Sequence, residues 1–309
     1  MPSLWFIVPA HGRLQLARIC LKQLRRTCDA LIEEGIQATA VVIADDENLY
    51  TARELGFGTI ERDNTFVSRR YNDGIQLACG GLEEPRECGV YRVVGRRDYR
   101  GHPEGMEFQA RLDPLAEHRA IGRGSIIRIG TEQVTVENFT LPDAPRADYV
   151  VPCGSDDWVD WRLFTDLPSA DTMVGFQRLS FVRPDGQEMV QRFLNVRGGC
   201  GIRIYPREIM ATLGYRPADE DRRRACDTSI ITNLWKQSRF TVEHREIDPR
   251  QIVDWKSLDN QLNPYESLTF HKSFANPQDP FVALADLYPA EALEDMRRHY
   301  ASVRALVPA

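Results

Sequence analysis

Lysine, paired cysteines and long apolar runs are all scarce in this sequence. Only four of its 39 basic residues are lysines, and the other 35 are arginines. The seven cysteines are odd in number and form no C-x-x-C pair, which argues against a zinc ribbon and against a secreted disulfide framework. No stretch reaches the roughly 18 apolar residues that a membrane span requires.

The apolar run nearest the N-terminus, residues 4–8, predicts a strand and not a signal peptide. It lacks a preceding basic segment and ends at Pro9. Together with the unpaired cysteines, this pattern leads us to expect a cytoplasmic protein with no membrane partner.

Several motifs of common enzymes are missing as well. The glycines of Gly122-Arg123-Gly124-Ser125 do not form G-x-G-x-x-G, which argues against a Rossmann dehydrogenase. The chain has no G-x-x-x-x-G-K-[ST] loop, no G-x-S-x-G elbow and no H-E-x-x-H pair. P-loop kinases, α/β-hydrolases and zincin-type proteases are therefore excluded.

What is present is the composition of a globular protein. The 309 residues are 42% hydrophobic and 27% charged, which excludes a disordered or collagen-like chain. This length predicts two domains, or one domain with a sizeable insertion. The net charge of −6 argues against a general polyanion binder, although arginine is the side chain that grips phosphate in a bidentate manner.

The first 79 residues alternate strands with helices. The strand at 4–8 is followed by a helix with apolar residues three and four apart from Leu14 to Leu31, and then by a buried strand at 38–44. The alternation continues with a helix at about 47–55, a strand at 59–61 and a helix at 66–79. Such a pattern favours a parallel sheet that binds ligands at the carboxyl ends of its strands.

The alternation stops at residue 80. Residues 80–146 hold short alternating runs between glycines and prolines, which predict a small β-rich insertion. The α/β pattern resumes later in the chain: a strand at 148–152, two strands around Pro184-Asp185-Gly186, helices near 206–213 and 226–237, a loop-rich stretch at 249–280 and a last helix at 289–306.

These patterns predict an α/β fold with a Rossmann-like, mostly parallel sheet flanked by helices. The predicted domains are a catalytic domain (1–79 and 147–248), the β-rich insertion (80–146), and a C-terminal loop and helix that complete the site (249–309).

Polar residues follow each predicted buried strand. The first strand ends in Pro9-Ala10-His11-Gly12-Arg13, the second in Asp45-Asp46, and a later one in Gly154-Ser155-Asp156-Asp157-Trp158. Because parallel strands present their carboxyl ends at one edge of a sheet, we expect these segments to meet in one crevice.

Asp156-Asp157 has two interpretations. Adjacent carboxylates after a buried strand are unfavourable unless something pairs with them, and Mg²⁺ or Mn²⁺ that bridges phosphate oxygens is the usual partner. Alternatively, Ser155 or Asp156 caps a helix that begins near Trp158.

In order and spacing, these segments resemble the inverting, family 2-like GT-A glycosyltransferases. Val8-Pro9-Ala10-His11-Gly12-Arg13 is similar to the family's VPxxxR-like turn, and Asp45 or Asp46 matches its nucleotide-binding aspartate. Arg70-Tyr71-Asn72-Asp73-Gly74 is similar to its RN-x-G helix start with one residue inserted, and Ser155-Asp156-Asp157 looks like its D-x-D segment. The resemblance covers about 4–79 and 147–237, and it implies a GT-A fold.

The resemblance implies a UDP-sugar donor and a Mn²⁺ or Mg²⁺ cofactor that assists departure of the nucleoside diphosphate. It places Asp157 at the metal, with His271 as a further ligand and His244 as the second choice. His11 either contacts phosphate or caps the helix after it. The implied nucleotide-sugar-binding residues are Pro9, Ala10, His11, Arg13, Asp45, Asp46, Arg69, Arg70, Asn72 and Asp156.

The resemblance also implies a general base near the start of a later helix, which matches Asp227. The family commonly shows Glu-Asp there, so Cys226 is a departure that leaves Glu220 and Asp221 as alternatives. An inverting reaction is favoured with Asp227 as base, whereas a retaining one follows if Asp227 is not the base. A nucleotidyltransferase and a non-catalytic nucleotide-binding module share the sheet and acidic pair, and both stay open.

Arginine clusters offer the only indication of an acceptor. Arg96 and Arg97 in the insertion and Arg223 before Asp227 could contact a phosphate backbone, and Trp255 in a polar stretch could stack on a ligand. With these clusters the chain resembles phage-type transferases that decorate hydroxymethylated DNA bases. That resemblance implies a 5-hydroxymethylpyrimidine acceptor in duplex DNA, reached by base flipping, and a location in the host cytoplasm. A glycan, a protein or a small molecule remains an alternative acceptor.

Overall fold

The chain folds into two compact units, Met1–Cys79 with Ala147–Ala309 and Gly80–Arg146. The computed structural model describes most of the first unit and the strands of the second. Within the described residues, no helix is long and apolar enough to cross a membrane. The described residues are 1–63, 66–79, 90–96, 107–109, 125–129, 132–139, 146–193, 201–221, 226–237, 239–257 and 274–306.

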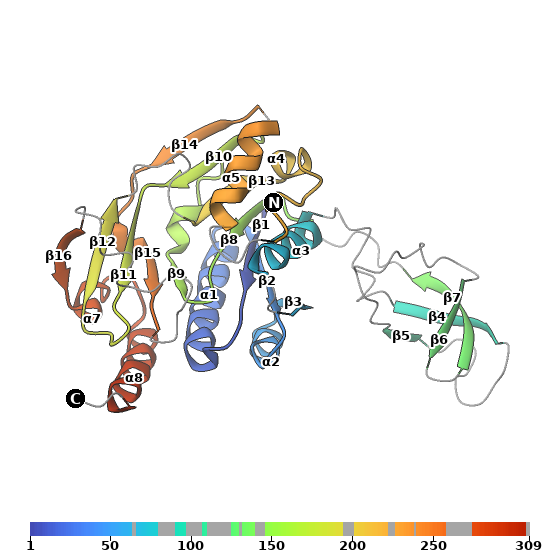
Figure 1. Cartoon of the computed structure of the whole chain (residues 1–309), viewed down its shortest axis with the longest axis horizontal. Coiled ribbons are helices and arrows are strands. Elements are labelled where there is room, and N and C mark those ends of the chain that lie inside the picture. Colours follow the sequence, from blue (N-terminus) through green and yellow to red (C-terminus); the bar gives the residue numbers. More distant parts are fainter. Residues whose placement is uncertain are drawn as a thin grey trace. The chain divides into compact units, whose positions relative to one another are not determined.

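The first unit is built on a seven-stranded sheet of order β14-β10-β13-β8-β1-β2-β3 (Figure 1). In that order the strands are Thr241–Arg245, Thr172–Phe176, Arg203–Pro206, Tyr149–Pro152, Ser3–Pro9, Gln37–Ala44 and Gly58–Glu61. β13 runs antiparallel to both neighbours, whereas β8, β1, β2 and β3 are parallel to one another. The chain is therefore a mixed α/β protein with a mixed sheet, and the parallel part lies where the sequence alternates strands and helices.

Helices cover both faces of this sheet. On one face lie α1 (Leu14–Glu33), α2 (Asn48–Glu54) and the 3-10 helix η1 (Trp161–Phe164). On the other lie α3 (Val67–Cys79), α4 (Arg207–Ala211) and α5 (Cys226–Gln237). Alternate residues of β1 serve the two cores, because successive side chains of a strand point to opposite faces.

Gly74 sets how closely α3 approaches the sheet. A Cβ atom at this position would lie 2.4 Å from Ile7 Cγ2 and 2.8 Å from Ile43 Cδ1. Glycine is otherwise unfavourable inside a helix, so its place here reflects close packing. This contact fixes α3, which carries Arg69, Arg70 and Asn72, against β1 and β2.

A second sheet of order β16-β12-β11-β15-β9 lies beside α1 (Figure 1). Its strands are, in that order, Phe274–Gln278, Met189–Phe193, Arg178–Val182, Ile252–Trp255 and Asp157–Val159. The helices α7 (Pro280–Ala283) and α8 (Ala290–Leu306) and the 3-10 helix η2 (Pro249–Gln251) complete this part. The side of α1 that faces away from the first sheet packs with α8 and the second sheet into a third core.

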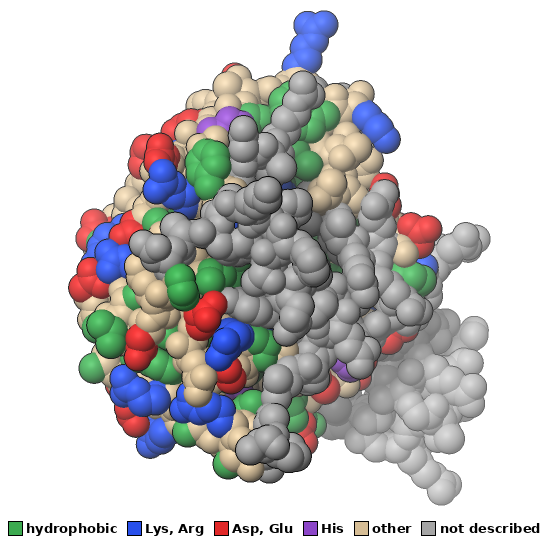
Figure 2. Space-filling model, turned by 60° about the vertical axis from the view of Figure 1, so that its left-hand side comes forward, with side chains coloured by type: hydrophobic (Ala, Val, Ile, Leu, Met, Phe, Trp, Pro, Cys, Tyr) green, Lys and Arg blue, Asp and Glu red, His purple; other side chains and the backbone are tan. Residues whose placement is uncertain are grey.

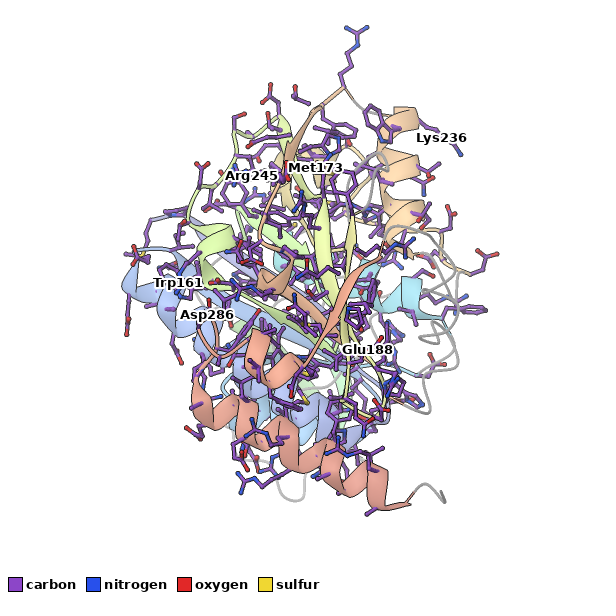
Figure 3. The ribbon with its side chains drawn as sticks, turned by 90° about the vertical axis from the view of Figure 1, so that its left-hand side faces the viewer. Trp161, Met173, Glu188, Lys236, Arg245 and Asp286 are labelled. Atoms are coloured by element: carbon purple, nitrogen blue, oxygen red, sulfur yellow. The ribbon has the colours of Figure 1, made fainter. Side chains whose placement is uncertain are left out.

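Figure 3 shows how polar and apolar side chains divide between surface and interior. Met173 of β10 is fully buried, whereas Lys236 projects from α5 into solvent. Arg245 at the end of β14 donates to the carbonyl oxygen of Asp166 and to the carboxylate of Glu243, so it ties the end of β14 to the loop after η1.

The second unit contains a four-stranded antiparallel sheet of order β5-β4-β7-β6. Its strands are Glu107–Gln109, Val90–Arg96, Glu132–Phe139 and Ser125–Ile129.

Candidate metal and nucleotide site

The carboxyl ends of β1, β2 and β8 bring their polar segments together, as the sequence predicts. His11 and Arg13 follow β1, Asp45 and Asp46 follow β2, and Asp156 follows β8. Arg13 bonds to Asp156 across 143 residues of sequence, and His11 bonds to Asp45 across 34. The two resulting groups of ionisable side chains differ in burial and in charge balance.

Arg13 holds the turn after β1 in an unusual conformation. Gly12 has φ +58° and Arg13, at the N-terminal end of α1, has φ +47°. A left-handed conformation is unfavourable for a residue with a Cβ, so its surroundings must hold it. The Arg13 guanidinium donates to a carboxylate oxygen of Asp156 and to Ser155 Oγ at 3.2 Å, which ties α1 to the loop after β8.

We call His11, Asp45, Asp46 and Arg70 the outer cluster. Asp45 Oδ1 lies 3.0 Å from His11 Nδ1 and 3.1 Å from Arg70 Nη2. Asp46 accepts backbone N–H groups from Gly12 at 2.6 Å and from Asn48 at 3.0 Å. Although burial alone would raise the pKa of Asp45, the bond from His11 and the charge of Arg70 hold it below its ordinary value.

Arg70 is a structural member of this cluster. Its side chain is 1% exposed and donates to the carbonyl oxygens of Ala10 at 2.6 Å, Asp63 at 2.9 Å and Arg62 at 2.9 Å. A diphosphate would have to replace these buried bonds. The prediction that Arg70 binds the diphosphate is therefore wrong: this residue positions Asp45 and the turn after β1.

Asn72 also differs from the prediction. It is fully buried, and its amide donates to Ala218 O at 2.8 Å and accepts from Ala218 N at 2.9 Å. Both ends of the amide therefore hold α3 to a loop before α5, and the buried side chain is not accessible to a nucleotide. Arg69 is 39% exposed, stacks over Phe66 and approaches Glu220, so it stays accessible to a ligand.

We call Asp156, Asp157 and Asp254 the carboxylate triad. Each offers one oxygen, and these oxygens lie within 4.8 Å of one another. Asp157 of β9 stands directly opposite Asp254 of β15 in an antiparallel pair, where like charges are destabilising. Gly154 makes room for this approach, because a Cβ there would lie 2.7 Å from Asp157 Oδ2 and 2.8 Å from Asp156 Oδ1.

Two cations partly balance the triad. Arg13 pairs with Asp156, and the buried Lys256 ammonium lies 2.5 Å from Asp254 Oδ2. Burial opposes the charge on Lys256, but Asp254 and Asp156 outweigh it and raise the pKa of this ammonium. Lys256 therefore stays charged and is part of the site.

The three carboxyl groups respond differently to this environment. Burial and the neighbouring Asp254 and Asp156 raise the pKa of Asp157 well above its ordinary value. Burial raises the pKa of Asp254 to about 6, with Asp156 adding to the shift and Lys256 opposing it. For Asp156, burial acts upward but Arg13 and Lys256 lower the pKa below its ordinary value. Two cations cannot neutralise three carboxylates, so Asp157 and Asp254 keep their protons more readily than free carboxyl groups do.

The donor set of the triad fits a hard divalent cation. Asp254 Oδ1 is buried and has no hydrogen-bond partner among the described residues. An unsatisfied buried carboxylate oxygen is unfavourable, and carboxylate oxygens are the ligands that Mg²⁺ and Mn²⁺ prefer. The helix-capping interpretation of Asp156 is wrong, because Trp158 lies in β9 and the next helix, η1, is capped by Asp160.

Sequence reasoning missed Asp254 and Lys256. The signal available was an acidic residue inside the apolar stretch Ile252-Val253-Asp254-Trp255, followed at once by a lysine. The prediction that Trp255 stacks on an acceptor is also wrong. This residue lies in β15 with no exposed surface, against Trp158 at 4.9 Å and Tyr300 at 5.8 Å between ring centroids, so it cannot stack on an acceptor.

The remaining predicted residues fall into two groups. Pro9 ends β1, and Ala10 is buried with its N–H bonded to Ile43 O at 2.9 Å, so both border the crevice. The other group cannot be compared with the prediction: His271, Arg97 and Arg223 lie outside the described residues, and only the backbone is described at Arg96, in β4, and at Asp227, the second residue of α5.

Neither a protein-family model nor a curated protein sequence matches this chain.

Proposed function

We propose that this chain is a metal-dependent glycosyltransferase with a GT-A fold that transfers a sugar from a UDP-sugar to an acceptor hydroxyl. The carboxylate triad carries the proposal. Three half-buried carboxyl groups, one with an oxygen that has no hydrogen-bond partner among the described residues, come together just after β8, and the partly exposed Asp45 follows β2 of the same sheet as β8. Open α/β sheets bind ligands at this edge.

In this proposal the triad and Arg13 organise the donor. Asp156, Asp157 and Asp254 would hold Mn²⁺ or Mg²⁺, which when bound neutralises charge on the departing diphosphate. Lys256 and Arg13 keep the carboxylates apart and oriented. Asp45 and His11, which are 30% and 51% exposed, can accept or donate hydrogen bonds to the base or ribose.

Asp227 is our choice for the general base of an inverting reaction. Its backbone begins α5, a helix long enough to direct the positive end of its dipole toward this position. A carboxylate at a helix start is stabilised in its charged form, so it would be ready to take the proton of an acceptor hydroxyl.

The binding test uses UDP and Mn²⁺ in calorimetric titrations. We expect UDP affinity to rise with Mn²⁺ in the wild type and to lose that dependence in Asp157→Asn. The matched control is Asp166→Asn, which removes one carboxylate of 86% exposure and leaves the triad unchanged. A UDP affinity that changes neither with Mn²⁺ nor in Asp157→Asn would overturn the proposal.

Turnover separates the alternatives. Release of UDP from a UDP-sugar supports glycosyl transfer, whereas release of pyrophosphate from a nucleoside triphosphate identifies a nucleotidyltransferase. Tight nucleotide binding without either product identifies a binding module.

For the acceptor we propose 5-hydroxymethylpyrimidine in duplex DNA. The support is the arginine-rich sequence at 92–100 and 222–224. On the face seen in Figure 2, the coloured basic and acidic side chains intermingle. We expect hydroxymethylated DNA to gain the mass of one sugar per modified base. Robust transfer to a glycan or protein with none to DNA would contradict this acceptor.

A further inference from the structure

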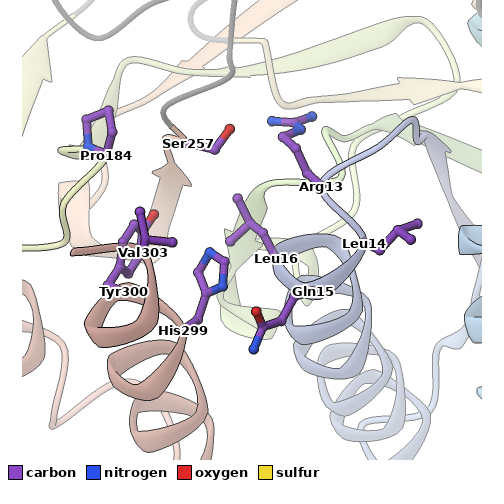
Figure 4. A pocket seen from close by; sticks show the side chains of 9 residues that line it. All are labelled: Arg13, Leu14, Gln15, Leu16, Pro184, Ser257, His299, Tyr300 and Val303. Atoms are coloured by element: carbon purple, nitrogen blue, oxygen red, sulfur yellow. The ribbon is translucent and has the colours of Figure 1, made fainter. Parts of the chain in front are cut away.

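A cavity lined in part by Arg13 lies at the N-terminal end of α1. It has a volume of about 300 Å³ and lies between the first turn of α1, the end of β15, the turn before β12 and the helix α8 (Figure 4). α8 contributes Tyr300 and Val303, and α1 contributes Leu14 and Leu16 from the opposite side. All of these elements belong to the first unit of the chain.

The lining is largely apolar and also includes the polar side chains of Arg13, Gln15, Ser257 and His299 (Figure 4). Leu16 and Tyr300 are buried, while Leu14 is 40% exposed at the N-terminal end of α1. Ser257 Oγ is buried and has no hydrogen-bond partner within the described part of the chain. An apolar wall with a few convergent polar groups is the usual construction of a small-molecule site.

Arg13 and Lys256 connect the cavity to the carboxylate triad. Arg13 lines the cavity, and its guanidinium bonds to Asp156 and Ser155. On the other side, the Tyr300 hydroxyl donates to the carbonyl oxygen of Lys256 at 2.7 Å. A molecule in the cavity would therefore contact Arg13, whose guanidinium also contacts Asp156 of the triad.

We propose that this cavity holds the acceptor, and that the acceptor group it takes is a planar aromatic or heteroaromatic ring carrying a hydroxyl. This inference rests on the proposed glycosyl transfer. The apolar walls formed by Leu14, Leu16, Tyr300 and Val303 suit the faces of a ring, and Ser257 Oγ, which no other described residue bonds, suits its polar edge.

The same lining disfavours two other ligand classes. A sugar carries hydroxyl groups around its whole ring, and apolar walls would leave most of them without partners. A free anion would approach three carboxyl groups that are paired with only two cations, Arg13 and Lys256. A neutral ring with one or two polar substituents meets neither obstacle.

The test measures binding of simple probes by ligand-observed NMR without nucleotide or metal. The probes are benzyl alcohol, 5-hydroxymethyl-2′-deoxycytidine and, as the sugar control, methyl β-glucoside. Val303→Trp fills the cavity from α8, and Leu14→Asp replaces an apolar wall with a carboxylate at a helix N-terminus, where an acid is tolerated. Ala301→Trp adds the same bulk at an exposed position of α8 and is the matched control.

We expect both ring probes to bind the wild type and Ala301→Trp, and to lose affinity by about ten-fold or more in Val303→Trp and Leu14→Asp because the apolar cavity is filled or made acidic. Unchanged binding of the ring probes to both cavity variants would overturn the inference. So would failure of both to bind the wild type, or preferential binding of methyl β-glucoside.

Titration of the same samples with UDP and Mn²⁺ tests the transferase proposal separately. We expect Val303→Trp to bind UDP as the wild type does, and to raise the KM for acceptor while leaving the KM for UDP-sugar unchanged. A wild type that binds ring probes but no UDP contradicts glycosyl transfer and supports the cavity as a ring site. A raised KM for UDP-sugar alone would assign the cavity to the donor and overturn its role for the acceptor.

Discussion

The outer cluster and the carboxylate triad both lie near the carboxyl ends of the parallel strands, but their carboxyl groups are partnered differently. Asp45 and Asp46 each accept two hydrogen bonds, and the pKa of Asp45 is lowered. In the triad, Asp157 and Asp254 face each other across two strands, and the pKa of both is raised. A satisfied cluster stabilises the fold around it, whereas an unsatisfied one is stabilised by a ligand of opposite charge.

The largest effect on the free energy of unfolding should come from a substitution in the outer cluster. Arg70→Met removes a buried guanidinium that serves three carbonyl groups and Asp45, so we expect the free energy of unfolding to fall by about 3 kcal/mol. Urea unfolding measures this loss. Mn²⁺ affinity of the folded protein should stay unchanged, and a parallel loss of Mn²⁺ affinity would show that the two clusters act as one.

The largest effect on metal binding should come from the triad. Asp254→Asn removes the carboxylate with the unpartnered oxygen, and we expect Mn²⁺ affinity to fall by more than about 100-fold, since outer-shell partners alone contribute 10–100-fold. Calorimetric titration with Mn²⁺ measures it. His11→Ala tests whether His11, Asp45 and Asp46 hold the metal instead. An equal loss of Mn²⁺ affinity in that variant would assign the metal to the outer cluster.

The fold could be predicted from the sequence more fully than the site, because the site depends on contacts between residues that are far apart in the sequence. The apolar runs at 4–8 and 38–44 correspond to β1 and β2, and the predicted helix at 226–237 matches α5. These elements depend on local periodicity. Asp254 joins Asp157 only because β15 pairs with β9, which no local pattern encodes.

Motifs located residues better than they assigned roles. The segment from Arg70 to Gly74 brings Arg70 to Asp45 at the end of β2, yet Arg70 and Asn72 bond mainly to the backbone of neighbouring loops. Trp255 was misplaced because Asp254 and Lys256 on either side made its segment look like a polar loop. Those two charges neutralise each other inside the protein.

The pH dependence of the free energy of unfolding, measured on metal-free protein, should also distinguish the two clusters. The folded-state pKa of Asp254, about 6, exceeds its ordinary value of 3.8, so the folded protein binds more protons than the unfolded chain between these values. Stability should therefore fall by about 2 kcal/mol as the pH rises from 4 to 7. Asp45 has the opposite sign: its lowered pKa contributes stability above its ordinary value that is lost as the pH falls.

Urea unfolding in a chelator from pH 3 to pH 7 separates the two signs. We expect Asp254→Asn to flatten the decline between pH 4 and pH 7, and Asp45→Asn to reduce the loss of stability at the acid end. An unchanged slope in Asp254→Asn would show that Asp254 is not protonated more readily in the folded chain.

The smallest effect concerns Arg13, which links the triad to the turn after β1. Arg13→Gly and Arg13→Ala both remove the guanidinium from Asp156, but only alanine keeps a Cβ at φ +47°. We expect Arg13→Gly to be more stable than Arg13→Ala by about 1 kcal/mol, because glycine adopts the left-handed region without a steric penalty. Urea unfolding of both variants measures the difference. Equal stabilities would mean that the turn relaxes once the guanidinium is gone, and that the bond to Asp156 is what holds Arg13 in this conformation.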